Sequence, residues 1–295
     1  MNRHDRLIQG MTGMGDFRVV AARTSDAIEA MRDRADLSPV ATVALGRLVT
    51  GAVLLARLLD KGNERGQQIT LRIDGGGPLG LIIAEANTAG FVRGFVGNPR
   101  VDDPEIDVGR AVGTDGFLTV IRTAVPTGKP YTSQVALVSG EIARDIAGFL
   151  ETSEQIASAV MLGVHISSEG VDAAGGMIVQ RFPYVDNVDV EVMETLLKDA
   201  PNFSSLLAKM PLDDVVEEVL RGSGYKPLDS KFDVPIEFRC GCTRERALAP
   251  YRLLEDSEIR EMIEVEGGSV ATCQFCGERY QFSPEDLREL NVDRS

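Results

Sequence analysis

The sequence predicts an α+β fold in three consecutive parts: an N-terminal mixed sheet with helices, a helical segment, and a small C-terminal domain that contains every cysteine. Strand-like segments cluster in the first part instead of alternating strictly with helices, which favours α+β over a doubly wound sheet. Only helical patterns follow, and the four cysteines come last. We place the three parts at residues 1–183, 184–230 and 231–295.

Half-buried strands are predicted where apolar and polar residues alternate in short runs. Four such runs lie in the first part, at residues 67–74, 81–87, 117–124 and 133–138. Helical patterns occupy residues 26–35, 39–59 and 141–161. The second of these helices is apolar enough to resemble a membrane span, but it contains Arg47 and Arg57, and a central arginine costs roughly 2.5 to 3.5 kcal/mol on an insertion scale. We therefore predict a buried core helix with Ser38 as its N-cap.

A glycine-rich motif at residues 75–80 matches the G-x-G-x-x-G dinucleotide fingerprint letter for letter. That fingerprint requires a helix directly after it, whereas a strand-like run continues here, so we interpret the motif as a hairpin turn. His165 lies in another strand-like run and is interpreted as a core or edge residue rather than a ligand. The sequence offers no acid, base and nucleophile constellation, so we do not expect an enzyme.

The helical part contains one clearly amphipathic stretch. Its apolar side chains recur at i, i+3, i+4, i+7 and i+8, at Leu212, Val215, Val216, Val219 and Leu220. Pro201 and Pro211 divide residues 186–221 into short helices with little core of their own. Two interpretations stay open at this point: an ordinary helical layer on the first part, or a segment whose folding depends on a neighbour.

Composition and charge disfavour several classes of partner. Hydrophobic residues make up 43% and charged residues 26%, which is typical of globular proteins. The net charge of -14, with no basic patch, argues against nucleic acid and anionic membranes as partners. The N-terminal residues show neither an apolar core nor a small-residue cleavage site, so no secretory signal is predicted and we expect a cytoplasmic protein.

The four cysteines form two close pairs. Cys240 and Cys242 have C-x-C spacing, Cys273 and Cys276 have C-x-x-C spacing, and residues 243–272 separate the pairs. Two such pairs can place four thiolates at the corners of a tetrahedron around zinc. The C-terminal part is also so small that a hydrophobic core alone would be marginal. One structural zinc ion per chain is therefore predicted.

Other roles for these cysteines fit the sequence less well. Permanent disulfides require an oxidising compartment, and a thioredoxin-type dithiol requires a helix where the residues after Cys276 predict a strand. A cysteine nucleophile needs a base, but His4 and His165 are distant in sequence. The C-x-C pair can close a disulfide only in a small, strained ring, and strained disulfides are labile. Spacing alone therefore leaves a reversible switch and a permanent zinc site both open.

The cysteine motifs resemble those of a known family. CGCTRER from Cys240 and CQFCGERYQF from Cys273 are similar to the zinc motifs of the bacterial redox-regulated holdase chaperones, the heat-shock proteins of thirty-three kilodaltons. DGGGPLG from Asp74, SEQIAS from Ser153 and AAGGMIVQ from Ala173 extend the resemblance over nearly the whole chain.

This resemblance implies an ATP-independent holdase that oxidation activates. Peroxide or hypochlorous acid would form the disulfides Cys240 with Cys242 and Cys273 with Cys276, zinc would leave, and the zinc domain and the helical linker would unfold. The exposed apolar surface would bind unfolding client proteins, often in a homodimer. As a hypothesis, the client-binding residues are Leu212, Val215, Val216, Val219 and Leu220. The alternative is a constitutive zinc-ribbon adaptor that binds nucleic acid or another protein.

Overall fold

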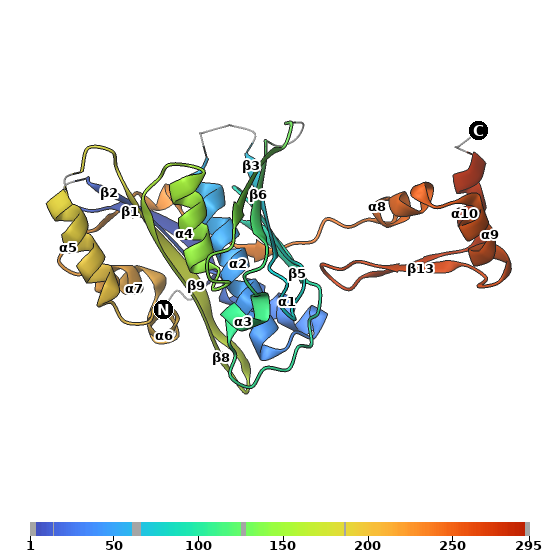
Figure 1. Cartoon of the computed structure of the whole chain (residues 1–295), viewed down its shortest axis with the longest axis horizontal. Helices are drawn as coiled ribbons and strands as arrows, with labels where there is room; N and C mark the ends of the chain where they lie inside the picture. The colour runs from blue at the N-terminus through green and yellow to red at the C-terminus, as the bar shows by residue number, and fades with distance from the viewer. Residues whose placement is uncertain (1–3, 14, 61–65, 125–127, 186, 293–295) are drawn as a thin grey trace. The chain divides into compact units, whose positions relative to one another are not determined.

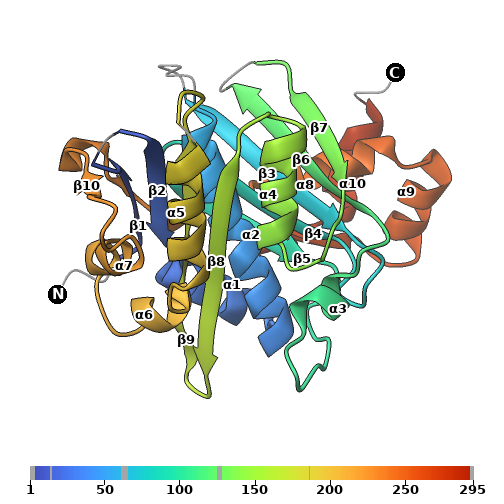
Figure 2. The same cartoon turned by 60° about the vertical axis from the view of Figure 1, so that its left-hand side comes forward.

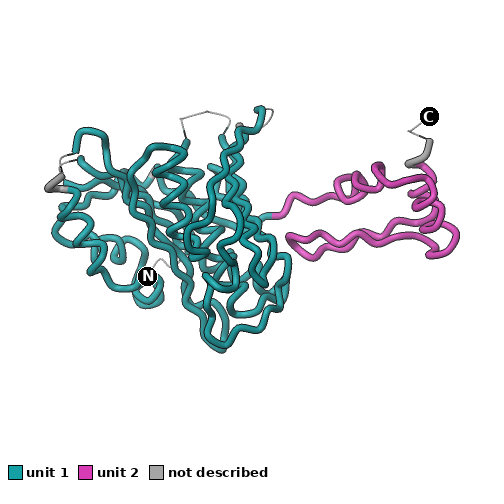
Figure 3. The backbone as a smooth tube through the Cα atoms, in the orientation of Figure 1, with its two compact units in different colours: residues 1–239 teal, residues 240–295 magenta. Residues whose placement is uncertain are grey.

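The computed structural model describes residues 4–13, 15–60, 66–124, 128–185 and 187–292. The chain forms two compact units, residues 1–239 and 240–295 (Figure 3). The first unit contains two six-stranded sheets, and the second contains a two-stranded sheet. The segment that the sequence pattern sets apart as helical, residues 184–230, lies within the first unit.

The first sheet has the strand order β10-β1-β2-β9-β8, and β11 also pairs with β1. Its strands, all antiparallel, are β1 Arg6–Met11, β2 Phe17–Arg23, β8 Ser158–Ser167, β9 Gly170–Arg181, β10 Lys226–Pro227 and β11 Val234–Pro235. Successive side chains of a strand point to opposite faces. Val20 and Ile178 therefore lie in one hydrophobic core, and Val19 and Val179 in another.

The second sheet has the order β12-β5-β4-β3-β6-β7, in which only the β12–β5 pair is parallel. Its strands are β3 Gln67–Asp74, β4 Ile82–Asn87, β5 Phe91–Val96, β6 Phe117–Ala124, β7 Tyr131–Ala136 and β12 Glu237–Phe238. The four strands that the alternating pattern predicts are thus confirmed as β3, β4, β6 and β7.

Helix α2 (Pro39–Leu58) lies between the two sheets and contacts strands of both (Figure 1). The side chain of Ser38 accepts a hydrogen bond from the amide of Ala41, which confirms the predicted N-cap. Among the described residues this helix alone is long and apolar enough to cross a membrane, but 89% of its most apolar window is buried inside the protein. It is a core helix, as predicted. The shorter helices α1 (Ser25–Ala35) and α3 (Val108–Val112) pack against it.

One predicted helix is too long. The pattern predicts a helix over residues 141–161, but α4 spans Ala143–Thr152 and the chain forms strand β8 from Ser158 onward. Gln155, between them, has a positive φ of 58°, which no helix accommodates. Strand β8 pairs with β9, the next strand of the chain, with an irregularity between His165 and Ile166, and this hairpin ladder overrides the local helical pattern.

The glycine-rich motif forms the predicted turn between β3 and β4, which pair as an antiparallel hairpin. No helix follows it, so the dinucleotide interpretation is excluded. A Cβ atom on Gly77 would lie 2.5 Å from the carbonyl oxygen of Ala111. The glycine is needed because the turn packs directly on the backbone of α3. His165 lies on β8, an edge strand, as predicted.

Three short helices cover the face of the first sheet that points away from α2 (Figure 2). They are α5 Asn187–Lys198, α6 Phe203–Leu207 and α7 Leu212–Val219. Their apolar side chains pack with Ile8, Val19, Ala21 and Met177 of the sheet in a second hydrophobic core. We refer to α5, α6 and α7 together as the helical layer.

The second unit consists of short elements around a small core. These elements are α8 Arg244–Leu248, the 3-10 helix Ala249–Leu253, α9 Asp256–Glu264, β13 Ser269–Thr272, β14 Arg279–Phe282 and α10 Pro284–Val292. Among its described residues only Tyr251, Ile259, Phe282 and Leu287 form a buried apolar cluster. So small a core agrees with the prediction that this part needs an additional cross-link.

Candidate metal centre

Two loops of the second unit bring the cysteines together. Cys240 and Cys242 directly precede α8, whose first turn is capped by the side chain of Thr243. Cys273 and Cys276 lie in the turn between β13 and β14. The amide of Gly277, a residue with a φ of 75°, donates to the carbonyl of Cys273 at 2.8 Å and closes this turn. The strand predicted after Cys276 is confirmed as β14.

The four sulfur atoms form one compact cluster, in which all of them lie within 4.8 Å of one another. The Sγ atoms of Cys240 and Cys273 are 3.7 Å apart, and those of Cys242 and Cys276 are 3.4 Å apart. A zinc ion with Zn–S bonds of about 2.3 Å requires sulfurs about 3.8 Å apart at the corners of a tetrahedron. The donor set and its spacing therefore fit a closed four-thiolate metal site. It is the one cluster of potential metal ligands among the described residues.

Tyr280 connects this cluster to the core of the second unit. Its hydroxyl group donates a hydrogen bond to the Sγ atom of Cys242 at 3.2 Å. Its neighbour on β14, Phe282, packs edge-to-face against Tyr251 with ring centroids 5.4 Å apart. The same short strand therefore supplies both an apolar anchor and a donor to a sulfur ligand.

Two arginines of α8 fix the loop that carries Cys240 and Cys242. Arg244 donates to the carbonyl of Gln281 at 2.6 Å and to the carboxylate of Asp286 at 2.8 Å, and its guanidinium lies over the ring of Phe282. Arg246 donates to the carbonyl of Gly241 at 2.7 Å. Arg244 thus joins the C-x-C loop to the hairpin that carries the C-x-x-C pair.

The thiols of the cluster ionise unequally. Burial raises the pKa values of Cys273 and Cys276. Burial also opposes ionisation of Cys240, but hydrogen bonds from the amide of Cys242 and from the neighbouring thiols outweigh it and lower the pKa of Cys240. Because a metal ion binds the thiolate form, metal binding to this cluster releases protons and weakens as the pH falls.

The apolar residues of the predicted client-binding stripe lie elsewhere, in the first unit. Leu212, Val215, Val216, Val219 and Leu220 are each at most 2% exposed and face the first sheet. In this state the stripe is covered, so it can contact another protein only if the helical layer moves.

Polar contacts that the sequence pattern did not indicate hold the helical layer to β1 and β2. Arg6 forms ion pairs with Asp213 of α7 and, at 2.9 Å, with Asp233. Buried Arg23 donates to the carbonyl of Leu207, the last residue of α6, at 2.9 Å. These partners are about 200 residues apart, so no local signal could have identified them.

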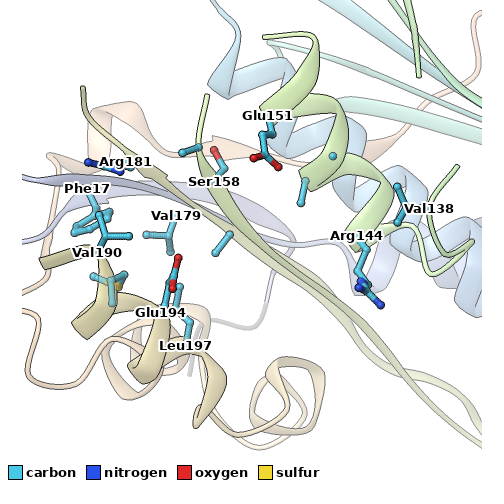
Figure 4. A pocket seen from close by; sticks show the side chains of 15 residues that line it. Phe17, Val138, Arg144, Glu151, Ser158, Val179, Arg181, Val190, Glu194 and Leu197 are labelled. Carbon is cyan, nitrogen blue, oxygen red and sulfur yellow. The ribbon is translucent and has the colours of Figure 1, made fainter. Parts of the chain in front are cut away.

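A groove in the first unit lies between α4 and α5 (Figure 4). Figure 4 shows Glu151 and Arg144 on α4, and Glu194, Val190 and Leu197 on α5. Its lining contains neither histidine nor cysteine.

Comparisons with known proteins identify the family. A family profile described as "Hsp33 protein" matches residues 5–283. The chain belongs to the Hsp33 family. A protein named "33 kDa chaperonin" from a strain of Thermus thermophilus is 46% identical over 97% of this chain and 86% of its own length. Its namesake from Bacillus velezensis is 38% identical over 97% of this chain and 98% of its own length.

Solved structures support the same assignment. The crystal structure of the 33 kDa chaperonin of Thermotoga maritima, described as a heat shock protein 33 homologue, matches with a TM-score of 0.88 and 34% identity over 99% of both chains. Membership of the Hsp33 family confirms the resemblance that the cysteine motifs indicated. This Hsp33-family chain is a chaperone, and the family is not one of enzymes.

Proposed function

We propose that this chaperone is an ATP-independent holdase whose activity is switched on by oxidation of Cys240, Cys242, Cys273 and Cys276. The observation that carries the proposal is the spacing of the four sulfurs, which matches the edges of a zinc–thiolate tetrahedron. One zinc ion, when bound, would keep all four sulfurs as thiolates and cross-link the C-x-C loop to the β13–β14 hairpin.

The same sulfurs are the oxidisable groups. A thiolate attacks one oxygen of hydrogen peroxide, the O–O bond breaks, and hydroxide leaves with the bonding electron pair. A second thiolate then attacks the resulting sulfenic acid and displaces a second hydroxide. Two protons from solvent convert the hydroxides to water. Each disulfide thus consumes one peroxide and removes two thiolates from the metal site.

We propose the disulfides Cys240 with Cys242 and Cys273 with Cys276. Sulfur contacts across the pairs, from Cys240 to Cys273 and from Cys242 to Cys276, are also present in this state. Because every sulfur lies within 4.8 Å of the other three, both pairings are within reach once the metal has left. Peptide mapping of the oxidised protein distinguishes the two pairings by mass.

We propose three functional parts: a chaperone core at residues 1–183, a linker at 184–230 and a redox-switch domain at 231–295. The helical layer lies in the linker, and its folding depends on the redox-switch domain. Its helices span 12, 5 and 8 residues, and isolated helices shorter than about 12 to 15 residues are marginal in water. They depend on packing against the first sheet. Their release would expose the client-binding stripe at Leu212, Val215, Val216, Val219 and Leu220, together with the apolar face of the sheet.

We also propose that the protein acts in the cytoplasm, where thiols stay reduced until oxidants appear. Its partners are unfolding proteins, and the oxidised form is a homodimer. The net charge of -14 supports the expectation that nucleic acid and membranes are not partners.

Light scattering from a heat-denatured client tests the switch. Peroxide-treated protein should suppress aggregation without nucleotide, and reduced, zinc-loaded protein should not. Zinc content and free thiols measured on the same samples should fall from one ion and four thiols to none. If both forms protected the client from aggregation equally, the redox switch would be contradicted and a constitutive zinc-ribbon adaptor would be favoured. An electrophoretic shift assay would then test that adaptor for binding to nucleic acid.

Limited proteolysis and hydrogen exchange test the conditional segment. Oxidation should accelerate cleavage and exchange between residues 187 and 221, while the strands before residue 183 stay protected. If exchange in the helical layer were equally slow in zinc-bound and zinc-free protein, the layer would be a permanent part of the fold and the switch would have to act elsewhere.

A further inference from the structure

Residues 226–239 run along one edge of each sheet of the first unit. Strands β10 and β11 lie beside β1, and β12 lies beside β5. Figure 2 labels β10 next to β1. Each of these added strands is only two residues long. We call residues 226–239 the edge cover. It begins seven residues after helix α7 and ends directly before Cys240, so it connects the helical layer to the cysteine centre.

The edge cover occupies the outward hydrogen-bonding groups of β1. The amide of Leu228 donates to the carbonyl of Gln9 at 2.8 Å, and the amide of Ile236 donates to the carbonyl of Asp5 at 3.1 Å. In a β-strand the N–H and C=O of one residue point to the same edge of the strand, and successive residues alternate between the two edges. Since Asp5 and Gln9 point away from β2, the N–H and C=O groups of Leu7 and Met11 also point away from β2. Their partners are Val234 and Lys226.

Two prolines prevent the outer side of the edge cover from pairing with a further strand. Pro227 lies opposite Gly10, and Pro235 lies opposite Arg6. Gly10 and Arg6 turn their backbone groups towards β2, so the nitrogens of the two prolines lie on the side away from β1. Proline has no N–H, and natural proteins use it with short strands to block edge-to-edge pairing. The described state therefore presents no free strand edge at β1.

The cover is held by short ladders and by the burial of Ile236 in the first hydrophobic core, and it shares one polar contact with the helical layer. Two short ladders are separated by the 3-10 turn Ser230–Phe232. The ion pairs of Arg6 hold Asp233 of the cover and Asp213 of α7 with one guanidinium. One arginine side chain therefore contacts both segments.

We propose that the outer edge of β1 is a strand-addition site for clients. The edge cover occupies it in the described state, and an extended segment of an unfolding client occupies it after the cover has left. The proposal rests on the function proposed above, which supplies the release. Main-chain hydrogen bonds do not depend on sequence, so this mode of recognition suits clients of unrelated sequence.

Specificity for unfolded apolar chains follows from the surface beside the edge. One face of β1 carries Ile8, which continues the apolar face of Val19 and Ala21 that the helical layer covers. An added strand would place every second side chain on that face. Extended segments with alternating apolar residues, which folded proteins bury and unfolding proteins expose, are therefore the ligands that fit.

Residue-resolved hydrogen exchange with heat-unfolded citrate synthase as the client tests the proposal. The amides of Leu7 and Met11 should exchange at least tenfold faster after oxidation and at least tenfold more slowly again once the client is bound. The amides of β7, an edge strand of the second sheet that has no outer partner strand among the described residues, are the internal control and should not respond to the client.

The possible results separate this proposal from the one on which it rests. If size-exclusion chromatography showed no complex after oxidation, the proposed holdase function would fail and strand addition with it. If a complex formed but Leu7 and Met11 still exchanged at the rate of the free oxidised protein, or β7 became protected in their place, strand addition at β1 alone would be overturned.

Discussion

The hydroxyl group of Tyr280 lies 3.2 Å from the sulfur of Cys242, close enough to donate to a thiolate while that thiolate binds a metal ion. Donors to ligating sulfurs orient the ligand and stabilise its negative charge. The strand β14 places this hydroxyl because Phe282, two residues on, is 2% exposed and anchored in the core. Tyr280 would thus be a positioning residue of the proposed zinc site.

We expect Tyr280→Phe to lower zinc affinity about tenfold, at the lower end of the effect of removing such contacts. Competition with a chromogenic chelator measures the affinity of the reduced protein. Tyr251→Phe is a matched control, because it removes a hydroxyl that contacts Ser269 in the same small core. If both variants bound zinc as tightly as the parent, the Tyr280 contact would have no role in metal binding.

Asp5 is a buried carboxyl group in the first unit, and it is 5% exposed. Burial raises its pKa to about 6, and the charge of Asp26 adds to this effect. The hydrogen bond from the amide of Ala27 and the charge of Arg23 act in the opposite direction without cancelling it. The folded state therefore binds a proton more readily than the unfolded state, in which the pKa is near 3.9.

The stabilising contribution of Asp5 is therefore complete below about pH 4 and is lost as the pH rises through about 6. Between pH 5 and pH 7.5 the parent should lose about 1.4 kcal/mol of unfolding free energy relative to Asp5→Asn, which cannot titrate. Urea unfolding of both proteins at the two pH values gives this difference. An unchanged difference would mean that Asp5 titrates near its ordinary value.

At the scale of secondary structure, the helical layer depends on the first sheet. The side chain of Val216 on α7 is completely buried against that sheet, whereas Val192 on α5 is 61% exposed. The two residues have the same side chain in neighbouring helices of the same layer. The same substitution at both positions therefore changes helix propensity equally but removes buried apolar surface only at Val216.

We expect Val216→Ser to destabilise the helical layer by about 2 to 3 kcal/mol, through lost apolar burial and a buried hydroxyl group. Cleavage between residues 187 and 221 in the zinc-loaded, reduced protein should then accelerate. Val192→Ser should stay within about 0.5 kcal/mol of the parent. Equal cleavage of the two variants would show that packing on the sheet does not control the layer.

At the scale of the whole molecule, the two units differ in what stabilises them. The first has two large hydrophobic cores, and the second has a cluster of four buried apolar residues among those described. Structural zinc contributes roughly 10 to 16 kcal/mol of apparent binding free energy in small peptides, more than many whole domains have. The proposed zinc ion would therefore be the larger source of stability for residues 240–295.

Removing zinc with a chelator under reducing conditions should unfold the second unit and leave both six-stranded sheets intact. Hydrogen exchange should show loss of protection at β13, β14 and α9, while β3, β6 and α2 retain theirs. Added zinc should restore the protection. If the zinc-free second unit stayed protected from exchange, zinc would not be the cross-link that keeps this unit folded. The proposed release of the helical layer would then fail as well.

The sequence by itself determined the features that arise from local spacing. The two cysteine pairs, the periodic apolar stripe from Leu212 to Leu220, the N-cap at Ser38 and four alternating strands could all be predicted. Each depends on residues a few positions apart, where backbone geometry fixes which side chains share a face or a turn. The family resemblance likewise came from short motifs, and the comparisons confirmed it.

The tertiary structure decided whatever depends on distant partners. Residues 158–161 join a strand because β9 offers a ladder, although their local pattern is helical. Arg6 meets Asp233 across 227 positions, and Tyr280 meets Cys242 across 38. The edge cover pairs with strands more than 140 residues before it. Hydrogen bonds and ion pairs of this kind exist only once the chain has folded, because folding alone brings their partners within a few ångströms.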